Sequence, residues 1–284
     1  MITLSDSKLF LSIIIPTRNR CNYLKQLLPV MLDQCDTIDP NNRQIELIVT
    51  DNASTDQTSE YISSLKKKYE RIVYVCNQEN IGADANFING VKLANGKYVW
   101  LFGDDELLTE RGISNVVDIL KRFSCSLLII KEESYSYGFN ESRLFNTYGE
   151  LVDSIAKINP HFLLAHTLIT SNIFKREIFD IPFAYRHISS NYGHMYAMLV
   201  NLKNGGYIFF LNDPIFIVRQ SRAEFSETPK LLGIKQVKYL QYIGKTYNNR
   251  YILKYSYRFA LKMLPEQVYF ELKNLKYKKK NSKN

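Results

Sequence analysis

Two adjacent carboxylates, Asp104 and Asp105, follow a short apolar run over residues 98–102, with Gly103 between. Aromatic and β-branched residues bounded by glycine predict a buried strand. Neighbouring carboxylates repel each other unless a cation lies between them, and Mg²⁺ and Mn²⁺ prefer carboxylate oxygens as ligands. The pair therefore predicts a divalent-metal site that receives a phosphorylated ligand. The alternative is a turn and a helix start, where acidic residues are common.

The elements that must position this pair alternate along the chain. Short apolar runs predict strands, and the segments between them carry apolar residues at helical spacing. Such alternation predicts an α/β fold with a mostly parallel sheet flanked by helices. The predicted strands cover residues 11–15, 45–50, 72–76, 98–102, 126–131, 168–174, 207–211 and 215–218; the predicted helices include 23–32, 83–94, 112–123 and 193–204, and residues 34–44 are predicted to be a polar connection.

Polar loops follow four of these strands, and ligands of open α/β sheets bind beyond the carboxyl ends of the strands. Asp51 is suited to accept hydrogen bonds from a nucleotide base, and Thr17 and Arg18 to contact the base or its phosphates. A metal on Asp104 and Asp105 would neutralise a leaving diphosphate. Each loop alone is also consistent with an ordinary turn. The four loops span residues 16–20, 51–56, 77–84 and 103–106.

Three common nucleotide and hydrolase motifs are absent from the sequence. Pro16-Thr17 stands where a G-x-G-x-x-G motif would follow the first strand. This counts against a nicotinamide- or flavin-binding enzyme, as the lack of G-x-x-x-x-G-K-[ST] counts against a P-loop NTPase. No G-x-S-x-G elbow of a hydrolase is present.

Positive charge is concentrated at the C-terminal end of the 284-residue chain. Residues 230–284 hold 14 Lys or Arg and 2 acids, whereas residues 1–229 hold 23 basic and 26 acidic residues. Tyrosine and leucine recur between the lysines, which predicts a basic amphipathic helical tail. Such helices bind anionic membrane surfaces, and the alternative is a helical cap on the domain with solvated lysines.

The rest of the composition is that of a globular protein of a reducing compartment. Four cysteines are widely spaced with no C-x-x-C pair, which counts against a structural zinc site or a disulfide framework. The N-terminus has no leader pattern and no run of eighteen apolar residues occurs, so we expect neither a signal peptide nor a transmembrane span. We expect a cytoplasmic protein that is peripheral on the inner face of the cytoplasmic membrane.

Four ordered blocks of sequence, L-S-I-I-I-P-T-R-N-R, I-V-T-D-N-A-S-T-D-Q-T, N-I-G-A-D-A-N-F and W-L-F-G-D-D-E-L-L, carry a resemblance. They resemble the motifs of glycosyltransferase family 2, the nucleotide-sugar transferases of the GT-A fold. The third and fourth blocks resemble most the subgroup that includes abequosyltransferases and other enzymes of bacterial surface-polysaccharide assembly. The resemblance covers residues 9–125 well, 165–222 loosely and the tail not at all.

The resemblance implies a role for each matching residue. Pro16, Thr17 and Arg18 would line the nucleotide pocket, and Asp51 would face the base. The ribose or the sugar would be bordered by Asn80, Gly82 and Asp84. Asp104 and Asp105 would correspond to the acidic motif that holds Mg²⁺ or Mn²⁺, with Asp105 also counted as catalytic. Relatives often carry a further acid where this chain has Phe102, so which of the two acids coordinates stays open.

The general base is the second departure from the family pattern. Inverting members generally use a carboxylate near the start of a helix in the acceptor half, and this chain has His194 there. The dipole of the following helix would favour neutral imidazole, the form that accepts a proton. His187, His166 and Asp180 are weaker candidates, and a packing role for His194 is the alternative.

Two arginines follow the last strand of the predicted sheet. Arg219 and Arg222 could clamp the diphosphate, because guanidinium binds phosphate oxygens in a bidentate manner. The alternative is that they are ordinary surface arginines.

These observations together predict a metal-dependent transferase. The expected domain covers residues 1–229, with a nucleotide-sugar half at 1–125 and an acceptor half at 126–229, and the tail covers 230–284. The expected reaction moves a sugar from a nucleotide-diphosphate donor to a hydroxyl of a lipid-linked glycan, with inversion. The alternatives are a sugar-phosphate nucleotidyltransferase, whose Gly-rich phosphate loop is absent, and a nucleic-acid-binding protein that uses the tail; we expect no nucleic-acid partner.

Overall fold

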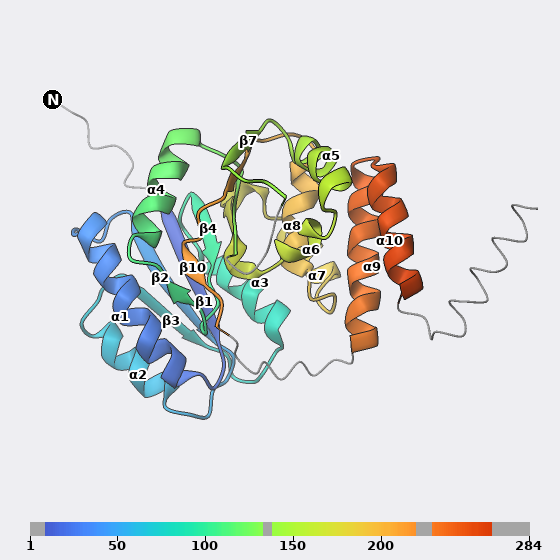
Figure 1. The fold of residues 1–284 in the computed structure, drawn as a ribbon. Coiled ribbons are helices and arrows are strands. Elements are labelled where there is room, and N and C mark those ends of the chain that lie inside the picture. Colours follow the sequence, from blue (N-terminus) through green and yellow to red (C-terminus); the bar gives the residue numbers. More distant parts are fainter. Residues whose placement is uncertain (1–8, 133–137, 220–228, 263–284) are drawn as a thin grey trace, which may run out of the picture. The chain divides into compact units, whose positions relative to one another are not determined.

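The computed structural model describes residues 9–132, 138–219 and 229–262 (Figure 1). The chain forms two compact units. The first takes in Met1–Leu151 and Ala165–Arg222, and the second Val152–Leu164 and Ala223–Asn284. The part of the predicted tail beyond residue 262 lies outside the described residues.

An eight-stranded sheet forms the centre of the first unit, in the order β3-β2-β1-β4-β8-β6-β9-β7. Strands β1 to β4 are parallel, and so are β6 and β9, which confirms the predicted mostly parallel α/β sheet. The strands are β1 (Leu11–Thr17), β2 (Ile45–Asp51), β3 (Ile72–Cys76), β4 (Tyr98–Leu101), β6 (Leu127–Ile130), β7 (Arg143–Phe145), β8 (Asn172–Lys175) and β9 (Ile208–Leu211). A separate two-stranded sheet pairs β5 (Leu107–Leu108) with β10 (Phe216–Ile217).

Strand β8 departs from the parallel pattern, because it runs antiparallel between β4 and β6. The predicted strand at 168–174 begins too early: a 3₁₀ turn, Ile169–Ser171, occupies its first half. The edge strand β7 is also antiparallel, to β9.

Helices cover both faces of this sheet (Figure 1). Alternate residues of the strands form one core with α1 (Cys21–Ile38), α2 (Thr58–Lys66) and α4 (Gly112–Phe123). On the other face, α3 (Ala83–Leu93) approaches β1 so closely that a Cβ at Gly90 would lie 2.4 Å from Ile14 Cγ2. Helices α7 (Ile181–Arg186) and α8 (Gly193–Leu202) pack against α3. The core holds the carboxyl ends of the parallel strands in place.

Helix α1 is longer than predicted, and the predicted polar connection at 34–44 is wrong over its first part. The helix continues through Pro29 to Ile38. Gln34 explains the extension: its amide donates to Thr109 O over 2.7 Å, and its oxygen accepts from Ile113 N at 3.0 Å. Gln34 can therefore lie on the buried face of α1 although it is polar, because both ends of its amide are hydrogen-bonded.

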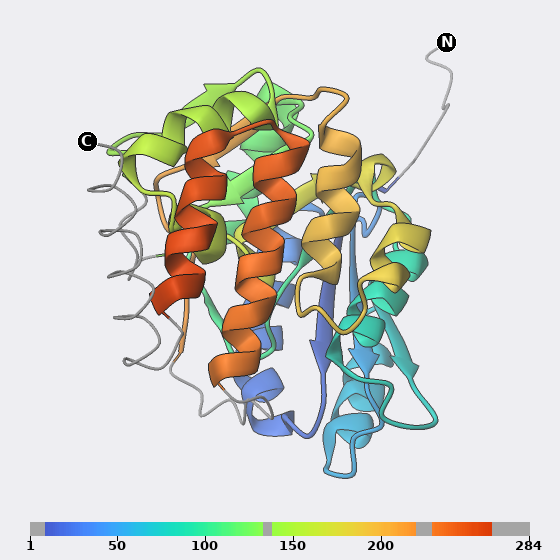
Figure 2. The same cartoon turned by 90° about the vertical axis from the view of Figure 1, so that its right-hand side faces the viewer.

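The second unit contains a helical hairpin, α9 (Pro229–Thr246) and α10 (Arg250–Lys262), whose helices lie side by side (Figure 2). Tyr239, Leu240, Ile243 and Ile252 are buried within it. The Asn249 amide donates to Asp153 Oδ1 over 2.6 Å. Helices α5 (Tyr148–Ile158) and α6 (Phe162–Ala165) precede it in the chain. Across the described ranges, no helix has both the length and the apolar character that crossing a membrane requires.

Candidate active site

The carboxyl ends of β1, β2 and β4 meet at one edge of the sheet. Thr17 pairs with Asp51 in register, and Asn52 N donates to Thr17 O over 2.9 Å. Phe102 N donates to Ile14 O over 2.8 Å, which fixes the end of β4 beside β1. The loops that carry the predicted donor-binding residues therefore leave the sheet next to one another.

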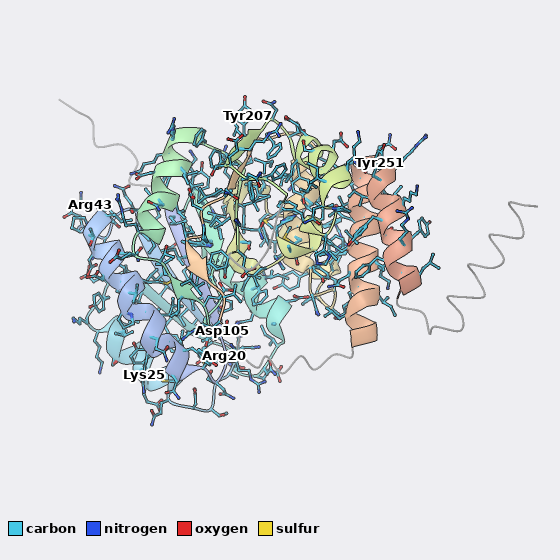
Figure 3. The ribbon with its side chains drawn as sticks, in the orientation of Figure 1. Arg20, Lys25, Arg43, Asp105, Tyr207 and Tyr251 are labelled. Atoms are coloured by element: carbon cyan, nitrogen blue, oxygen red, sulfur yellow. The ribbon has the colours of Figure 1, made fainter. Side chains whose placement is uncertain are left out.

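The acid pair lies at this edge and is held by partners from the loop after β1. Asp104 is buried, and its Oδ2 accepts a hydrogen bond from the Thr17 hydroxyl at 2.7 Å. Arg20 Nη1 lies 3.4 Å from Asp104 Oδ1 and forms an ion pair with Asp105 Oδ2. Figure 3 shows Arg20 and Asp105 close together. One guanidinium thus bridges two carboxylates.

Burial and charge set the ionisation of this cluster. Burial raises the pKa of Asp104 to about 6, although the Thr17 hydroxyl and Arg20 favour its ionised form. Burial alone would lower the pKa of Arg20, but the carboxylates of Asp104 and Asp105 more than offset it and raise that pKa. Two carboxylates beside one guanidinium leave a net negative charge, which favours the binding of a further cation.

Arg219, in the segment after β10, contacts the same cluster. Its Nε donates to Asp105 O, and its Nη1 donates to Gln26 Oε1 over 2.6 Å. The guanidinium carbons of Arg219 and Arg20 lie 4.7 Å and 5.5 Å from the centre of the Tyr23 ring. The Nη2 atom of Arg219 is buried without a hydrogen-bond partner. Arg222 lies outside the described residues.

Sequence reasoning missed Arg20, although it lies within the predicted loop 16–20. Its signal was a second arginine two positions after Arg18 in a loop facing an acid pair. Arg18 itself is exposed, and Pro16 is buried within β1 opposite Thr50. The structure therefore brings Thr17 and Arg20, rather than Arg18, to the carboxylates.

Asp51 is fully buried at the end of β2. Its Oδ1 accepts from Ser54 N at 2.8 Å, and its Oδ2 accepts from the Tyr74 hydroxyl at 2.8 Å. Burial and the neighbouring Asp51 carboxylate raise the pKa of Tyr74. A nucleotide base that binds Asp51 must therefore share the carboxylate with the Tyr74 hydroxyl or replace that hydrogen bond.

A network of asparagine side chains joins the loops after β2 and β3. Asn52 Nδ2 donates to Asn80 Oδ1 over 2.7 Å, and Asn52 Oδ1 accepts from Ile81 N at 2.9 Å. Asn77 Nδ2 donates to Asn52 Oδ1 and to Asn86 Oδ1, over 3.2 Å and 3.0 Å. The network holds Asn80 in a fixed position. Of its four asparagines, only Asn80 was singled out from the sequence.

The loop enters helix α3 through Gly82, whose φ of +85° is a conformation that L side chains rarely adopt. Asp84 lies in the first turn of α3 and accepts from Asn191 N at 3.2 Å. Asn80, Gly82 and Asp84 therefore follow one another around a single turn beside the Asp51 loop.

Glu106 is a buried acid that sequence reasoning left without a role. Burial, together with the charges of Asp105, Asp104 and Glu132, raises the pKa of Glu106 to about 8, although the Thr170 hydroxyl acts to lower it. Its Oε2 is buried without a hydrogen-bond partner. Glu106 thus favours its neutral form next to the acid pair in the chain.

His194 lies in the first turn of α8, as predicted, but it is buried. Its Nε2 lies 2.9 Å from Thr167 O and must donate to that carbonyl, so Nδ1 carries the free lone pair. Nδ1 is buried without a partner. Burial lowers the pKa of His194 to about 4, so burial rather than the helix dipole keeps the imidazole neutral.

The weaker candidates for the base have structural partners. His166 Nε2 lies 2.8 Å from the Tyr148 hydroxyl, and burial lowers its pKa to about 4. His187 Nδ1 lies 2.9 Å from Phe183 O. Asp180 caps α7 by accepting from Phe183 N at 2.7 Å.

The donor set for a metal is small. In the parts of the chain that the structure describes, no three or more His, Cys, Asp or Glu side chains group to hold an ion. Asp104 and Asp105 supply hard carboxylate oxygens, and such a pair suits Mg²⁺ or Mn²⁺ when phosphate oxygens and water complete the shell. The residues present fit a metal that arrives with its phosphorylated ligand.

Comparison with known proteins decides the family. Residues 12–181 match the sequence profile described as Glycosyl transferase family 2. The chain belongs to this family. Its members are glycosyltransferases, and the protein is therefore a glycosyltransferase. The abequosyltransferase RfbV of Salmonella typhimurium is 28% identical over 271 residues, 89% of this chain and 80% of that protein.

Two further proteins are similar over a shorter part of the chain or at lower sequence identity. A Campylobacter jejuni enzyme, named as a GalNAc(5)-diNAcBac-PP-undecaprenol beta-1,3-glucosyltransferase, is 32% identical over 108 residues, 38% of this chain and 33% of that protein. Among solved structures, Staphylococcus aureus TarS 1–349 in complex with UDP-GlcNAc has a TM-score of 0.64 at 15% identity and covers 90% of this chain and 71% of its own. That likeness confirms the GT-A-like fold.

Proposed function

We propose that this glycosyltransferase moves a sugar from a nucleotide-diphosphate donor to a hydroxyl of a glycan acceptor. The observation that carries the proposal is the cluster of Asp104, Asp105, Arg20 and Arg219 at the edge of the sheet where Asp51 and the asparagine network also lie. Acids that can hold a metal and arginines that can bind phosphate lie at the same edge of the sheet as Asp51, a carboxylate that can bind a nucleotide base. The family and the fold favour this reaction over the nucleotidyltransferase and nucleic-acid-binding alternatives.

The donor would lie across the carboxyl ends of β1, β2 and β4. Asp51 would accept from the base, and the turn from Asn80 to Asp84 would border the ribose or the sugar. Asp104 and Asp105 would hold Mg²⁺ or Mn²⁺, and the ion would neutralise the charge that develops on the departing diphosphate. A mannosyltransferase from Pyrobaculum calidifontis, similar in fold at a TM-score of 0.55 and 14% identity, is described in complex with GDP-Man and Mn²⁺; the match covers 91% of this chain and 75% of that one.

His194 would remove the proton from the acceptor hydroxyl, and the transfer would invert the anomeric centre. The lone pair on its Nδ1 supports this role, because the Nε2 proton is committed to Thr167 O. An acceptor hydroxyl must reach a buried nitrogen, so the surroundings of His194 would open when the acceptor binds.

A screen of nucleotide sugars for release of nucleoside diphosphate tests the reaction. We expect one donor to give release that depends on added Mg²⁺ or Mn²⁺ and that is abolished by Asp105→Asn. Tyr207→Ser provides a matched control, because Tyr207 is exposed and labelled away from Asp105 in Figure 3. Release by no donor in a complete panel, with folded protein, would contradict the proposal.

The acceptor would be a lipid-linked glycan in the assembly of a bacterial surface polysaccharide such as an O-antigen or a capsule. Two names support this: RfbV is an abequosyltransferase, and the Campylobacter jejuni relative is named for a PP-undecaprenol substrate. A protein with such an acceptor would work on the cytoplasmic side of the membrane.

The helical hairpin would hold the protein at an anionic membrane surface. Helices α9 and α10, residues 229–262, contain eight Lys or Arg and no acid. On α10, one face exposes basic and aromatic side chains together: Arg250, Tyr251, Lys254, Tyr257 and Arg258. Basic side chains attract anionic headgroups while tyrosine rings enter the interface.

Sedimentation with vesicles tests the membrane proposal. We expect binding to vesicles with anionic lipid, weakened by salt, and a loss of at least about thirtyfold for the double change Lys254→Glu and Arg258→Glu, since each of the two basic residues contributes about 1 kcal/mol. Equal binding of wild type and variant to the vesicles would support the alternative, a cap with solvated lysines.

A further inference from the structure

We propose that Arg20 is a built-in counter-cation that competes with a divalent metal for Asp104 and Asp105, and that metal binding releases its guanidinium to the diphosphate of the donor. The second part of the proposal rests on the proposed function. The first part concerns the acid pair alone.

The contacts of the acid pair support competition. Arg20 holds Asp104 Oδ1 and Asp105 Oδ2, and the Thr17 hydroxyl holds Asp104 Oδ2. These contacts take up three of the four carboxylate oxygens. A metal that bridges the two acids needs an oxygen that Arg20 or Thr17 now uses. Arg20 cannot lose its charge within proteins, so a metal at this point repels it.

The surroundings of Arg20 show where the released guanidinium can go. Its side chain is 28% exposed, so it is not locked in place. It lies over Tyr23, and so does Arg219, which also contacts Asp105 through a backbone carbonyl. Arg219 keeps a buried Nη2 without a partner. Two guanidinium groups thus lie over the Tyr23 ring, and each can donate two parallel hydrogen bonds to phosphate oxygens of a diphosphate.

The arrangement couples the two ligands. Without a diphosphate, a metal that displaces Arg20 leaves the charge of its guanidinium uncompensated, so the metal binds weakly. With a diphosphate present, the released guanidinium gains a partner, so each ligand raises the affinity for the other by the same factor. When no ligand is bound, Arg20 also offsets part of the negative charge of Asp104 and Asp105.

Titration of Mn²⁺ against the full chain, followed by the electron paramagnetic resonance signal of free Mn²⁺, tests the competition without any nucleotide. We expect Arg20→Gln to bind Mn²⁺ at least about fivefold more tightly than wild type. Lys25→Ala should match wild type. Lys25 is a cation of α1, the helix that begins directly after Arg20, and it lies over Tyr61 instead of the acids (Figure 3). Thermal melts of Arg20→Gln and of Arg20→Ala select a variant that is folded.

Mn²⁺ affinity that is equal or lower in both folded Arg20 variants overturns the proposal. So does a gain in Lys25→Ala as large as in Arg20→Gln, because the effect would then be one of general charge.

Calorimetry with UDP, GDP, CDP and dTDP tests the second part. We expect Mn²⁺ to raise the affinity of wild type for one of them by about tenfold, and this gain to fall below about twofold in Arg20→Gln. An undiminished gain in the variant overturns the transfer of Arg20 to the diphosphate. If no nucleotide binds any protein, the proposed function fails, whereas the Mn²⁺ titration still decides the competition. If the Mn²⁺ titration fails while a nucleotide binds and donor is consumed, the proposed function stands and the role of Arg20 does not.

Discussion

The two halves of the main sheet treat their buried ionisable groups in opposite ways. Beside β1 and β4, Asp104 and Asp105 are paired with Arg20, an ionic partner that a ligand can replace. In the chain segments on either side of β8, His166 and His194 are kept neutral by burial, with the pKa of each lowered to about 4, and they contact polar groups of the second half of the chain. The first half thus holds an ion pair that a ligand can replace, whereas the two buried histidines of the second half are neutral.

The comparison indicates where each half can do chemistry. An acid–arginine cluster suits a ligand that brings its own charges, such as a metal and a diphosphate. A neutral imidazole with a lone pair suits the transfer of a single proton. The predictions below test this division, from the largest expected effect to the smallest.

Removing the exchangeable charge should have the largest effect. Asp105→Asn keeps the size of the side chain but removes the carboxylate that pairs with Arg20, so we expect turnover to fall about a hundredfold or more. Asp104→Asn should cost less, because burial already shifts the pKa of that carboxyl upward. Steady-state release of nucleoside diphosphate measures both. Equal losses would show that the two acids act as one unit.

His194→Gln tests whether the neutral half takes part in the reaction. We expect kcat to fall about a hundredfold with saturating donor, the usual contribution of a general base, while the KM for the donor changes little. His187→Gln is the matched control, since that ring stacks on Tyr196 with 4.3 Å between centroids. Near-wild-type turnover of His194→Gln would assign His194 a packing role and make the second half purely structural.

Glu106→Gln tests whether the buried Glu106 carboxyl is protonated in the folded protein, and the measured quantity is the free energy of unfolding. The folded-state pKa of Glu106, about 8, exceeds the ordinary value of about 4.3, so the folded state favours the protonated carboxyl. Its contribution to stability is therefore present below about pH 4.3 and lost as the pH rises toward 8. We expect Glu106→Gln to raise the free energy of unfolding at pH 8 by several kcal/mol, at most about 5 kcal/mol, and to leave it unchanged near pH 4.

Urea denaturation at several pH values measures this difference. A gain from Glu106→Gln that does not vary with pH would show that the glutamine merely packs better. A loss at pH 8 would show that Glu106 is ionised and paired in the folded protein.

Asp180→Ala should have the smallest effect. Asp180 accepts from Phe183 N as the cap of α7, and loss of such a cap costs about 1 kcal/mol. We expect a lower melting temperature and unchanged kcat. A large fall in kcat would identify Asp180 as the base and would place an ionised acid in the half that we describe as neutral.

The sequence predicts the first half of the sheet well, because each strand and the loop after it can be recognised from adjacent residues. Each of β1, β2 and β4 is a short apolar run that ends in polar residues, and parallel strands bring those ends together. Thr17 and Asp104 could thus be assigned to one edge although 87 positions separate them. The partner of Asp51, Tyr74, could not be predicted, because an alternating strand does not reveal which hydroxyl meets which carboxylate.

The second half was less predictable, since its features depend on distant contacts. Nothing in the four residues of β8 indicates that the strand runs antiparallel between β4 and β6. The burial of His194 follows from packing with α3, where its ring meets Phe87 at 6.3 Å, and helical spacing does not predict such a contact. The ion pairs of Arg20 likewise depend on a side-chain direction that sequence spacing leaves open.

The position of β8 also has a consequence for synthesis of the chain. Strands β1 to β4 are complete once residue 101 has been made, yet β4 gains its second neighbour only with Asn172–Lys175. Domains fold from the N-terminus as the chain emerges, so a nascent chain would carry β4 as an open edge over about 70 residues of translation. Open edges pair with other chains. Slow codons or stalled ribosomes in this interval would favour aggregation, and delays after residue 175 would not.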